Sequence, residues 1–197
     1  MLAIISPSKT QDFSQCNIDV FSQTRQIESS NELIGILKNK SKSQISKLMS
    51  LSEKLSELNF DRFQKFQLPF TLKNAKQAIL AFKGDVYNGI NAPELSHEDL
   101  EFAQGKVRML SGLYGVIRPL DLIQPYRLEM GTKLSNGKGG DLYEYWGSDI
   151  SNVLNEDESD LIVNLASNEY FKAIDKNNLN ANILDIVFKE KKGDTYK

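Results

Sequence analysis

The sequence contains almost no cysteine or histidine: Cys16 and His97 are the single examples among 197 residues. An intramolecular disulfide is therefore impossible, and a zinc site built from several Cys and His ligands cannot be assembled. Any catalysis must depend on carboxylates, Lys, Arg, Tyr, Ser or backbone donors. Because both residues lie in polar surroundings away from the motifs described below, we interpret them as incidental. We expect no metal site and no cofactor.

Long apolar runs are also missing. The N-terminal run Leu2-Ala3-Ile4-Ile5 is stopped by Ser6-Pro7 and has no basic flank, so it is too short for a signal peptide. Nothing approaches the ~18 consecutive apolar residues of a membrane span. Together with a free cysteine, these absences predict a cytoplasmic protein without a membrane partner.

The composition is that of a globular chain. Hydrophobic residues make up 40% of the sequence, and 24 basic residues against 26 acidic ones give a net charge of -2. This length suits one domain and is ample for a hydrophobic core. Helix and strand signals alternate irregularly, so we predict a single mixed α/β or α+β domain over residues 1–197, with a mixed sheet flanked by helices.

Several segments carry local helix or strand signals. The capping box Ser41-x-x-Gln44 predicts a helix with an apolar face that extends to Leu58, and Ser96-x-x-Asp99 starts another helix. Short apolar runs predict buried strands. The predicted strands are 1–5, 78–82, 161–165 and 182–189, a further helix is 141–155, and a turn is 191–194.

The near-neutral net charge hides an uneven distribution. Residues 105–140 carry six cations and two anions, a local charge of +4, so the remainder of the chain carries -6. The same segment holds 7 of the 12 glycines. A basic, glycine-rich stretch is a candidate anion-binding surface, although an ordinary solvated loop would have the same composition.

The strongest local pattern spans residues 107–122. An apolar stripe leads into a tight turn that contains Gly112 and Gly115, and Pro119 follows where a first helical position would fall. This order resembles a helix-hairpin-helix, which we place on residues 98–123. Because glycine has no Cβ, the backbone N–H groups of this turn would be able to approach a phosphate. The charge would come from Arg108, Arg118 and Arg127. The alternative is a plain glycine turn that packs the two residues between the glycines.

Three further motifs contain charged or hydroxyl side chains, and the first two of them follow predicted strands. They are Ser6-Pro7-Ser8-Lys9-Thr10, Lys83-Gly84-Asp85-Val86-Tyr87 and Arg127-Leu128-Glu129. Lys9 and Lys83 are candidates for phosphate contacts, and Asp85 or Glu129 could act as an acid or base if they shared a pocket. The alternatives are an ordinary loop for the first motif and a surface Lys83–Asp85 pair for the second.

These motifs together resemble the bacterial YaaA peroxide-stress protein family from Met1 to about Phe188. Besides the three motifs just given, the resemblance includes Leu110-Ser111-Gly112-Leu113-Tyr114-Gly115, Arg118-Pro119-Leu120-Asp121, Gln124-Pro125-Tyr126-Arg127-Leu128-Glu129-Met130-Gly131, Asp141-Leu142-Tyr143 and Asn164-Leu165-Ala166-Ser167. It implies a cytoplasmic protein that limits damage during hydrogen peroxide stress, in part by keeping intracellular iron low. It also implies a compact mixed α/β fold with a positively charged cleft that binds DNA through a helix-hairpin-helix. Relatives continue for several dozen residues with a further basic stretch, so the resemblance suggests a C-terminally shortened member.

Three hypotheses of function follow. The first is DNA binding through backbone contacts with little sequence specificity, by Lys9, Lys83, Arg108, Gly112, Gly115, Arg118 and Arg127. The second is an enzyme acting on a nucleotide, nucleoside or damaged base, with Lys9 and Arg108 on a phosphate and Asp85 or Glu129 as acid or base. The third is iron sequestration by Asp and Glu, although one His cannot supply the paired Glu-x-x-His motifs of di-iron sites. Convergence of these groups into a closed pocket would favour the enzyme, whereas a line along an open groove would favour DNA.

Overall fold

A five-stranded mixed sheet forms the centre of the computed structural model, which describes residues 1–187, 191–192 and 195–196. Its strand order is β6-β5-β1-β8-β9. The strands are β1 (Leu2–Ile5), β5 (Val107–Ser111), β6 (Gly115–Ile117), β8 (Leu161–Asn164) and β9 (Asn182–Asp185). β1 pairs in parallel with β5 and β8, β8 pairs in parallel with β9, and β6 is antiparallel to β5. The predicted mixed α/β class is confirmed, and so are the strands predicted at 1–5 and 161–165.

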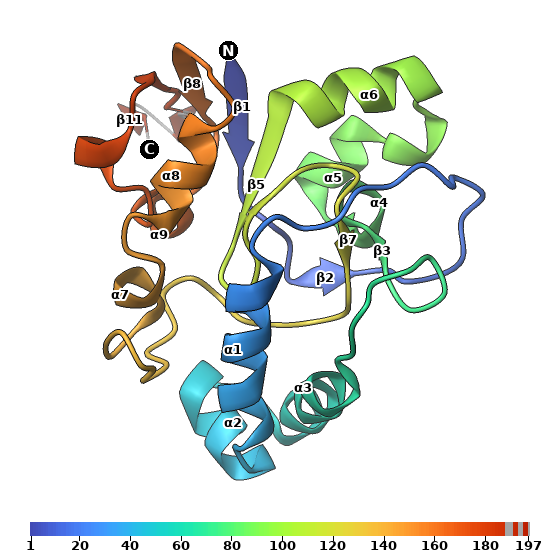
Figure 1. The fold of residues 1–197 in the computed structure, drawn as a ribbon, viewed down its shortest axis with the longest axis vertical. Helices are drawn as coiled ribbons and strands as arrows, with labels where there is room; N and C mark the ends of the chain where they lie inside the picture. Colours follow the sequence, from blue (N-terminus) through green and yellow to red (C-terminus); the bar gives the residue numbers. More distant parts are fainter. Residues whose placement is uncertain (188–190, 193–194, 197) are drawn as a thin grey trace.

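Three antiparallel two-stranded ladders accompany this sheet. They are β2 (Thr10–Gln11) with β4 (Phe82–Lys83), β3 (Lys76–Gln77) with β7 (Leu122–Ile123), and β10 (Lys191–Lys192) with β11 (Thr195–Tyr196). The β2–β4 ladder holds the chain that leaves β1 beside Phe82–Lys83, and the β3–β7 ladder joins Lys76–Gln77 to Leu122–Ile123 (Figure 1). The predicted strand 182–189 is present as β9, but its end at 188–189 and the predicted turn residues 193–194 lie outside the described residues.

Three helices pack together at one end of the molecule (Figure 1). They are α1 (Ile27–Lys38), α2 (Lys42–Met49) and α3 (Glu53–Lys65). The predicted capping box at the start of α2 is confirmed, because Ser41 and Gln44 exchange side-chain-to-backbone hydrogen bonds. The single helix predicted to reach Leu58 is wrong: Ser50 adopts a left-handed conformation with φ 51° and ends α2. Ser52 then starts α3, because short hydroxyl residues favour caps over helix interiors.

The remaining helices are short and surround the sheet. They are α4 (Ala78–Ala81), α5 (Asp85–Ile90), α6 (His97–Lys106), α7 (Leu142–Trp146), α8 (Asp149–Asn155) and α9 (Asn168–Phe171), with 3-10 turns at Ala92–Glu94 and Lys176–Asn178. The strand predicted at 78–82 is wrong, since the wholly buried run 78–81 forms one helical turn; a short apolar run does not distinguish the two structures. The predicted helix 141–155 is divided at Gly147, whose φ is +46°. The reciprocal capping box at Ser96 is present.

The predicted helix-hairpin-helix at 98–123 is not formed. The first helix, α6, ends at Lys106, and the apolar residues that follow continue as β5. Gly112 to Tyr114 connect β5 to β6 in a β-hairpin whose register pairs Ser111 with Gly115. β-branched residues favour strands on both sides of this turn. Pro119 lies in a turn closed by an Asp121 N–H donating to Arg118 O, so no second helix begins there.

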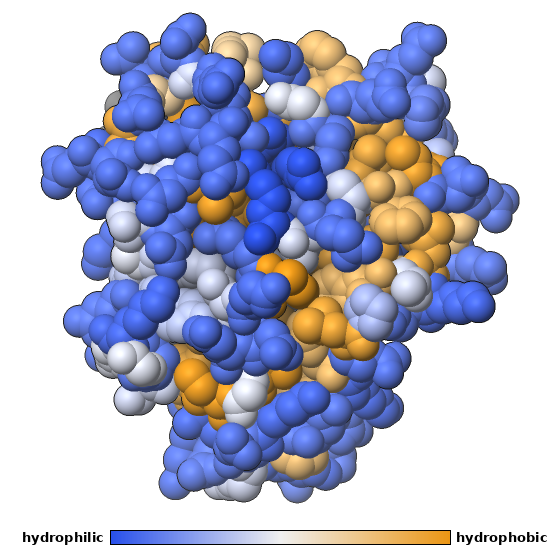
Figure 2. Space-filling view, viewed as in Figure 1, coloured by the Kyte–Doolittle hydropathy of each residue, from blue (hydrophilic) through white to orange (hydrophobic). Residues whose placement is uncertain are grey.

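The core lies on both faces of the central sheet. Its largest fully buried side chains include Trp146, Tyr114, Phe63 and Phe82. Figure 2 shows that hydrophilic residues cover most of the viewed face, with hydrophobic residues gathered toward the right of the view. No helix among the described residues is long and apolar enough to cross a membrane.

Candidate functional site

The loops that follow β1 and β8 lie side by side at the carboxyl edge of the parallel strands. The Ser167 N–H donates to Ser6 Oγ at 2.9 Å, and the Leu165 N–H donates to Ile4 O at 2.9 Å. Ligands of open α/β sheets bind at this edge, beyond the carboxyl ends of the strands. The Ser6–Thr10 motif is therefore placed where a binding site is expected.

The Ser6–Thr10 loop is held by two of the other motifs. The Tyr87 hydroxyl donates to Ser6 O at 2.8 Å, and Thr10 lies opposite Lys83 in the β2–β4 ladder. Gly84 lies next to Ser8 and has a φ of +122°, a backbone conformation that favours glycine. The Tyr126 N–H donates to Gln11 Oε1 at 3.2 Å and ties the 126–129 segment to the same loop. Three motifs far apart in sequence thus meet.

Lys9, Arg127 and Glu129 form a small ionic cluster at this meeting point. Lys9 Nζ is 3.2 Å from Glu129 Oε1, and Arg127 Nη2 and Nε donate to the same oxygen at 3.0 and 3.2 Å. Two cations against one carboxylate leave a net charge of +1. Lys9 has 63% of its side chain exposed, so it remains accessible to an anion from solvent. The enclosed space beside the cluster is only about 10 Å³, room for roughly one water molecule.

Two tyrosines form the inner wall of the cluster. Burial raises the pKa of Tyr126, whose hydroxyl lies 2.7 Å from Ser111 Oγ. Burial also raises the pKa of Tyr170, and the neighbouring Tyr126 and Glu169 add to that rise. Both side chains therefore stay neutral near pH 7, and the Tyr126 hydroxyl is directed to Ser111.

Lys83 and Asp85 do not pair with each other, and neither lines the space beside the cluster. Lys83 Nζ lies 3.8 Å from Asp12 Oδ2. The pKa of Asp12 is lowered, chiefly by hydrogen bonds from Ser14 and also by the charges of Lys76 and Lys83. Asp85 is exposed at the first position of α5, and its carboxylate forms no ion pair with any described residue.

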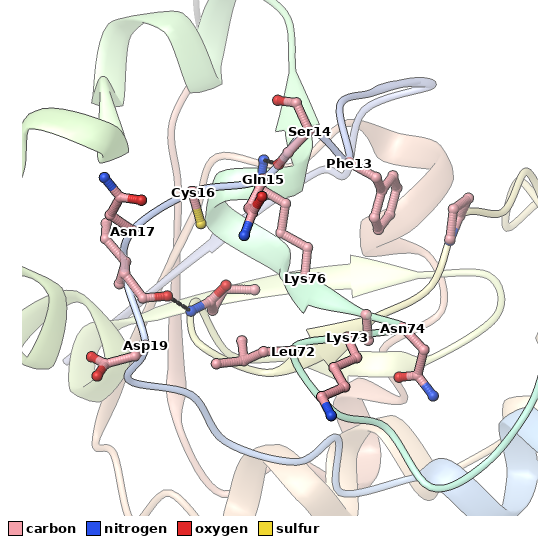
Figure 3. Close-up of a pocket in the computed structure, with 14 residues that line it drawn as sticks. Phe13, Ser14, Gln15, Cys16, Asn17, Asp19, Leu72, Lys73, Asn74 and Lys76 are labelled. Atoms are coloured by element: carbon pink, nitrogen blue, oxygen red, sulfur yellow. Dashed lines mark hydrogen bonds between the residues drawn. The ribbon is translucent and has the colours of Figure 1, made fainter.

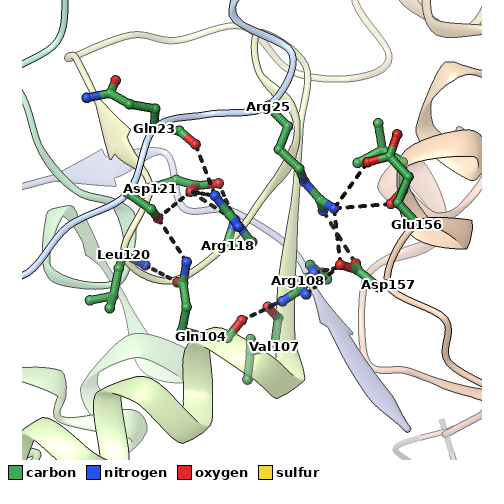
Figure 4. Close-up of polar contacts among 12 residues, drawn as sticks. Gln23, Arg25, Gln104, Val107, Arg108, Arg118, Leu120, Asp121, Glu156 and Asp157 are labelled. Carbon is green, nitrogen blue, oxygen red and sulfur yellow. Dashed lines mark hydrogen bonds and ion pairs between the residues drawn. The ribbon is translucent and has the colours of Figure 1, made fainter.

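The buried Arg108 side chain forms hydrogen bonds and an ion pair within the protein. It is 4% exposed; its Nε and Nη2 donate to the Asp157 carboxylate at 2.6 and 2.8 Å, and its Nη1 donates to Gln104 O at 2.8 Å. Arg25 reaches the same carboxylate at 3.1 Å (Figure 4). Burial opposes ionisation of Asp157, but hydrogen bonds and charges from the two arginines outweigh it and lower its pKa. Arg108 thus joins β5 to the segment after α8 and is not available to a phosphate.

Arg118 is also engaged internally. Its Nε and Nη2 donate to Asp121 Oδ1 at 3.1 and 2.9 Å, and Nη2 reaches Gln23 O at 3.1 Å. Asp121 is fully buried and accepts further bonds from the Arg118 N–H at 2.8 Å and from Ser22 Oγ at 2.6 Å. The pair holds the turn after β6 against the 22–23 segment (Figure 4).

Gly112 and Gly115 are buried and face other parts of the chain. A Cβ at Gly112 would collide with Leu128 O, and one at Gly115 would collide with the side chain of Gln26. Gly115 also has a φ of +67°, which favours glycine. The carbonyl of Gly112 accepts a hydrogen bond from Trp146 Nε1 at 3.1 Å. These glycines therefore allow close packing in the core, and their backbone is not exposed to a phosphate.

A residue that the sequence patterns did not indicate, Arg62 on α3, lies near Arg127. Burial and the charge of Arg127 lower the pKa of Arg62. Its guanidinium donates to Asn59 Oδ1 at 3.3 Å and pairs with no carboxylate among the described residues. Arg62 is remote in sequence from every motif and lies within an ordinary amphipathic helix, so no local signal identifies it.

Arg62 forms part of an open depression of about 390 Å³ that is also lined by Lys65, Lys73 and Pro125. Asp61 contributes the one carboxylate side chain among its lining residues. From Pro125 the chain leads directly to Arg127 and the Lys9 cluster. We call this surface the basic groove; it comprises Lys9, Arg62, Lys65, Lys73 and Arg127. The cations follow an open surface and do not surround a closed cavity.

No metal centre is evident in the part of the chain that the structure describes. Within it, no group of three or more His, Cys, Asp or Glu side chains is arranged to hold an ion. The hypothesis of iron sequestration by carboxylates therefore gains no support from the geometry.

The fold and the site define a mixed α/β protein with a cationic cluster at the carboxyl edge of its parallel strands. A family model described as peroxide stress protein YaaA matches residues 1–197. A UPF0246 protein of Acaryochloris marina is 54% identical over 200 residues, which cover 100% of this chain and 79% of the relative. The chain belongs to the YaaA peroxide stress protein family.

Proposed function

We propose that this protein acts in the cytoplasm during peroxide stress by binding DNA along the basic groove, and that this binding limits iron-dependent oxidative damage. Membership of the YaaA peroxide stress family supports the cellular context. The observation that carries the DNA-binding part is the basic groove itself. Five cations from four separate segments line an open surface on which Asp61 and Glu129 are the neighbouring carboxylates.

Phosphate binding requires little rearrangement of the groove. Lys9 is largely exposed, and exposed ion pairs are worth only about 0–1 kcal/mol, so Lys9 can exchange Glu129 for a phosphate at small cost. Arg62 retains guanidinium donors without a carboxylate partner among the described residues. Contacts of this kind bind the DNA backbone and carry little sequence information.

An open groove supports binding better than enzymatic turnover. The space of about 10 Å³ beside Lys9, Glu129 and Tyr170 does not admit a nucleotide. Glu129 lines that space and Asp85 does not. The two carboxylates that an enzyme of nucleotides would use as acid and base therefore do not share it.

DNA binding offers a direct route to lower iron damage. A protein that neutralises DNA phosphates releases the cations condensed on them. Iron(II) held at DNA is such a counterion, so occupation of the phosphates by the basic groove would displace it.

Fluorescence anisotropy of a labelled duplex, titrated with protein at several salt concentrations, tests this function. Arg62→Gln and Arg127→Gln should each weaken binding and reduce the slope of log K against log salt by about 1, as expected for loss of one phosphate contact. Lys106→Gln is the matched control, because this substitution also removes one positive charge. Lys106 is exposed at the amino end of β5, the end of the sheet opposite to the candidate site. If the double Arg variant binds with unchanged affinity and slope while its melting curve shows a folded protein, the groove is not the DNA site.

A further inference from the structure

A pocket of about 420 Å³ adjoins the basic groove (Figure 3). Its walls are the irregular segment 13–19 and the segment 72–77, and it shares Lys73, Asn74 and Pro125 with the groove. This volume falls within the roughly 300–1,000 Å³ of small-molecule sites. Apolar side chains such as Phe13 and Leu72 line it together with amide and charged groups, which is the composition expected of a ligand site.

A buried lysine that makes no direct ion pair lies in the wall of this pocket, although the Asp12 carboxylate is close enough to interact with its charge. Lys76 is 8% exposed, and its Nζ donates to Asp12 O at 3.1 Å and to Ser14 O at 2.9 Å. It forms no ion pair with a described residue. An ammonium has three donors, so one N–H of Lys76 remains available, and a buried donor without an acceptor is costly. A ligand anion would accept from this remaining N–H, with exposed Lys73 at the rim adding a second positive charge.

A buried acceptor without a donor lies beside that lysine. Gln77 is fully buried and lines the same pocket. Its Nε2 donates to Ile18 O at 2.9 Å and to Val20 O at 2.8 Å, which fixes the orientation of the amide. Its Oε1 has no hydrogen-bond donor among the described residues. Leaving a buried acceptor unpaired costs about 1–3 kcal/mol, and an N–H group of a ligand would remove that cost.

We propose that this pocket binds one unpaired nucleotide, with its phosphate at Lys73 and Lys76, its base against Phe13, and a base N–H donated to Gln77 Oε1. Flat bases stack on aromatic side chains, and every base carries or can present polar edge groups. The inference rests on the proposed function, because the groove leads a bound strand to the pocket through shared residues. The nucleotide comes either from such a strand or from the free mononucleotide pool, and both present the same chemistry.

The single cysteine of the chain provides the assay. Cys16 is partly exposed and lines the pocket, so a bound nucleotide shields its thiol from alkylation. The rate of Cys16 alkylation is measured in the presence of AMP, inorganic phosphate, a single-stranded oligonucleotide and a blunt duplex. We expect AMP, the single strand, or both to slow alkylation saturably by fivefold or more. Phosphate and the duplex should slow it less than twofold. Protection by AMP alone identifies the free nucleotide as the source, and protection by the strand alone identifies the strand.

Variants test the pocket. Lys73→Gln, at the residue that the pocket shares with the groove, should weaken protection of Cys16 roughly tenfold through loss of a charge-assisted contact, whereas Lys106→Gln should leave protection unchanged. Phe13 lines the pocket and not the groove, so Phe13→Ala should weaken protection through loss of stacking and leave duplex binding unchanged. The inference is overturned if neither AMP nor the single strand protects Cys16, or if phosphate alone protects as well as AMP. Duplex anisotropy is recorded on the same samples. If the duplex binds but Cys16 is not protected, the nucleotide pocket is wrong and the proposed DNA-binding function stands. If Cys16 is protected but the duplex does not bind, the proposed function is wrong and the pocket is a site for free nucleotides.

Discussion

Replacement of Asp157 by Asn would leave Arg108 buried without its counterion. Arg108 is 4% exposed and makes two hydrogen bonds to Asp157 at 2.6 and 2.8 Å, and Arg25 makes a third contact at 3.1 Å. Breaking a buried pair by removing one partner typically costs about 3–5 kcal/mol. For a chain of this size, each kcal/mol lowers Tm by about 2–4 °C, so we expect a decrease of roughly 6–20 °C.

The assay is urea unfolding monitored by circular dichroism and by the fluorescence of buried Trp146. Arg108→Met should be similarly destabilising, whereas Arg108→Met with Asp157→Leu should recover much of the loss, because the buried charge of Arg108 and its counterion are removed together and Arg25 keeps its contact with Glu156 at 3.7 Å. None of these variants should change DNA affinity per folded molecule. An Arg108→Met variant that costs less than about 1 kcal/mol and loses DNA affinity would refute this reasoning.

The same ion pair predicts a pH dependence of stability. The folded protein holds the pKa of Asp157 below its ordinary value, so the unfolded chain binds this proton more readily. The pair therefore contributes stability above the ordinary Asp pKa of about 3.9, and that contribution is lost as the pH falls through the lower folded pKa. The acid limb of the stability curve should flatten in Asp157→Asn.

Three other predictions concern local structure. Gly115→Ala should destabilise the fold by more than about 1 kcal/mol, measured by urea unfolding, because φ is +67° and the added Cβ meets Gln26. Ser41→Ala should cost about 1 kcal/mol through loss of the capping box of α2, and Ser41→Asp should retain most of that stability. Tyr87→Phe removes the 2.8 Å hydrogen bond to Ser6 O and should cost about 1 kcal/mol; by loosening the loop that carries Lys9, it should also weaken duplex binding in the anisotropy assay.

Local chemistry explains which parts of the fold could be predicted. β1 and β8 are short apolar runs bounded by polar residues, and the caps at Ser41 and Ser96 depend only on residues three positions apart. The 98–123 segment was assigned wrongly because an apolar stripe around two glycines fits a helical hairpin and a β-hairpin alike. Pairing of β5 with β1, about a hundred residues away in sequence, decided in favour of strands.

The residues of the candidate site also divide into those that local sequence patterns identified and those that only the tertiary structure placed. Lys9, Lys83, Arg127 and Glu129 were identified from short polar patterns, and the structure brings them to one edge of the sheet. Arg108 and Arg118 carried an equally strong local signal. Both arginines instead form ion pairs inside the protein, with Asp157 and Asp121 respectively. Asp157 lies 49 positions from Arg108 in the sequence, and Asp121 belongs to a buried turn, so neither pairing is visible in the local pattern.

The sequence by itself determined the family, the mixed α/β class, the positions of the helix caps, and the concentration of positive charge in a chain with a net charge of -2. The tertiary structure decided which of those charges are available to a ligand. It paired Arg108 and Arg118 internally, added Arg62 from a distant helix, and left Lys76 buried in a pocket wall without a direct ion pair to any described residue. The physical reason is that charge and capping are local properties. Burial and ion pairing, in contrast, depend on which distant segments the packed sheet brings together.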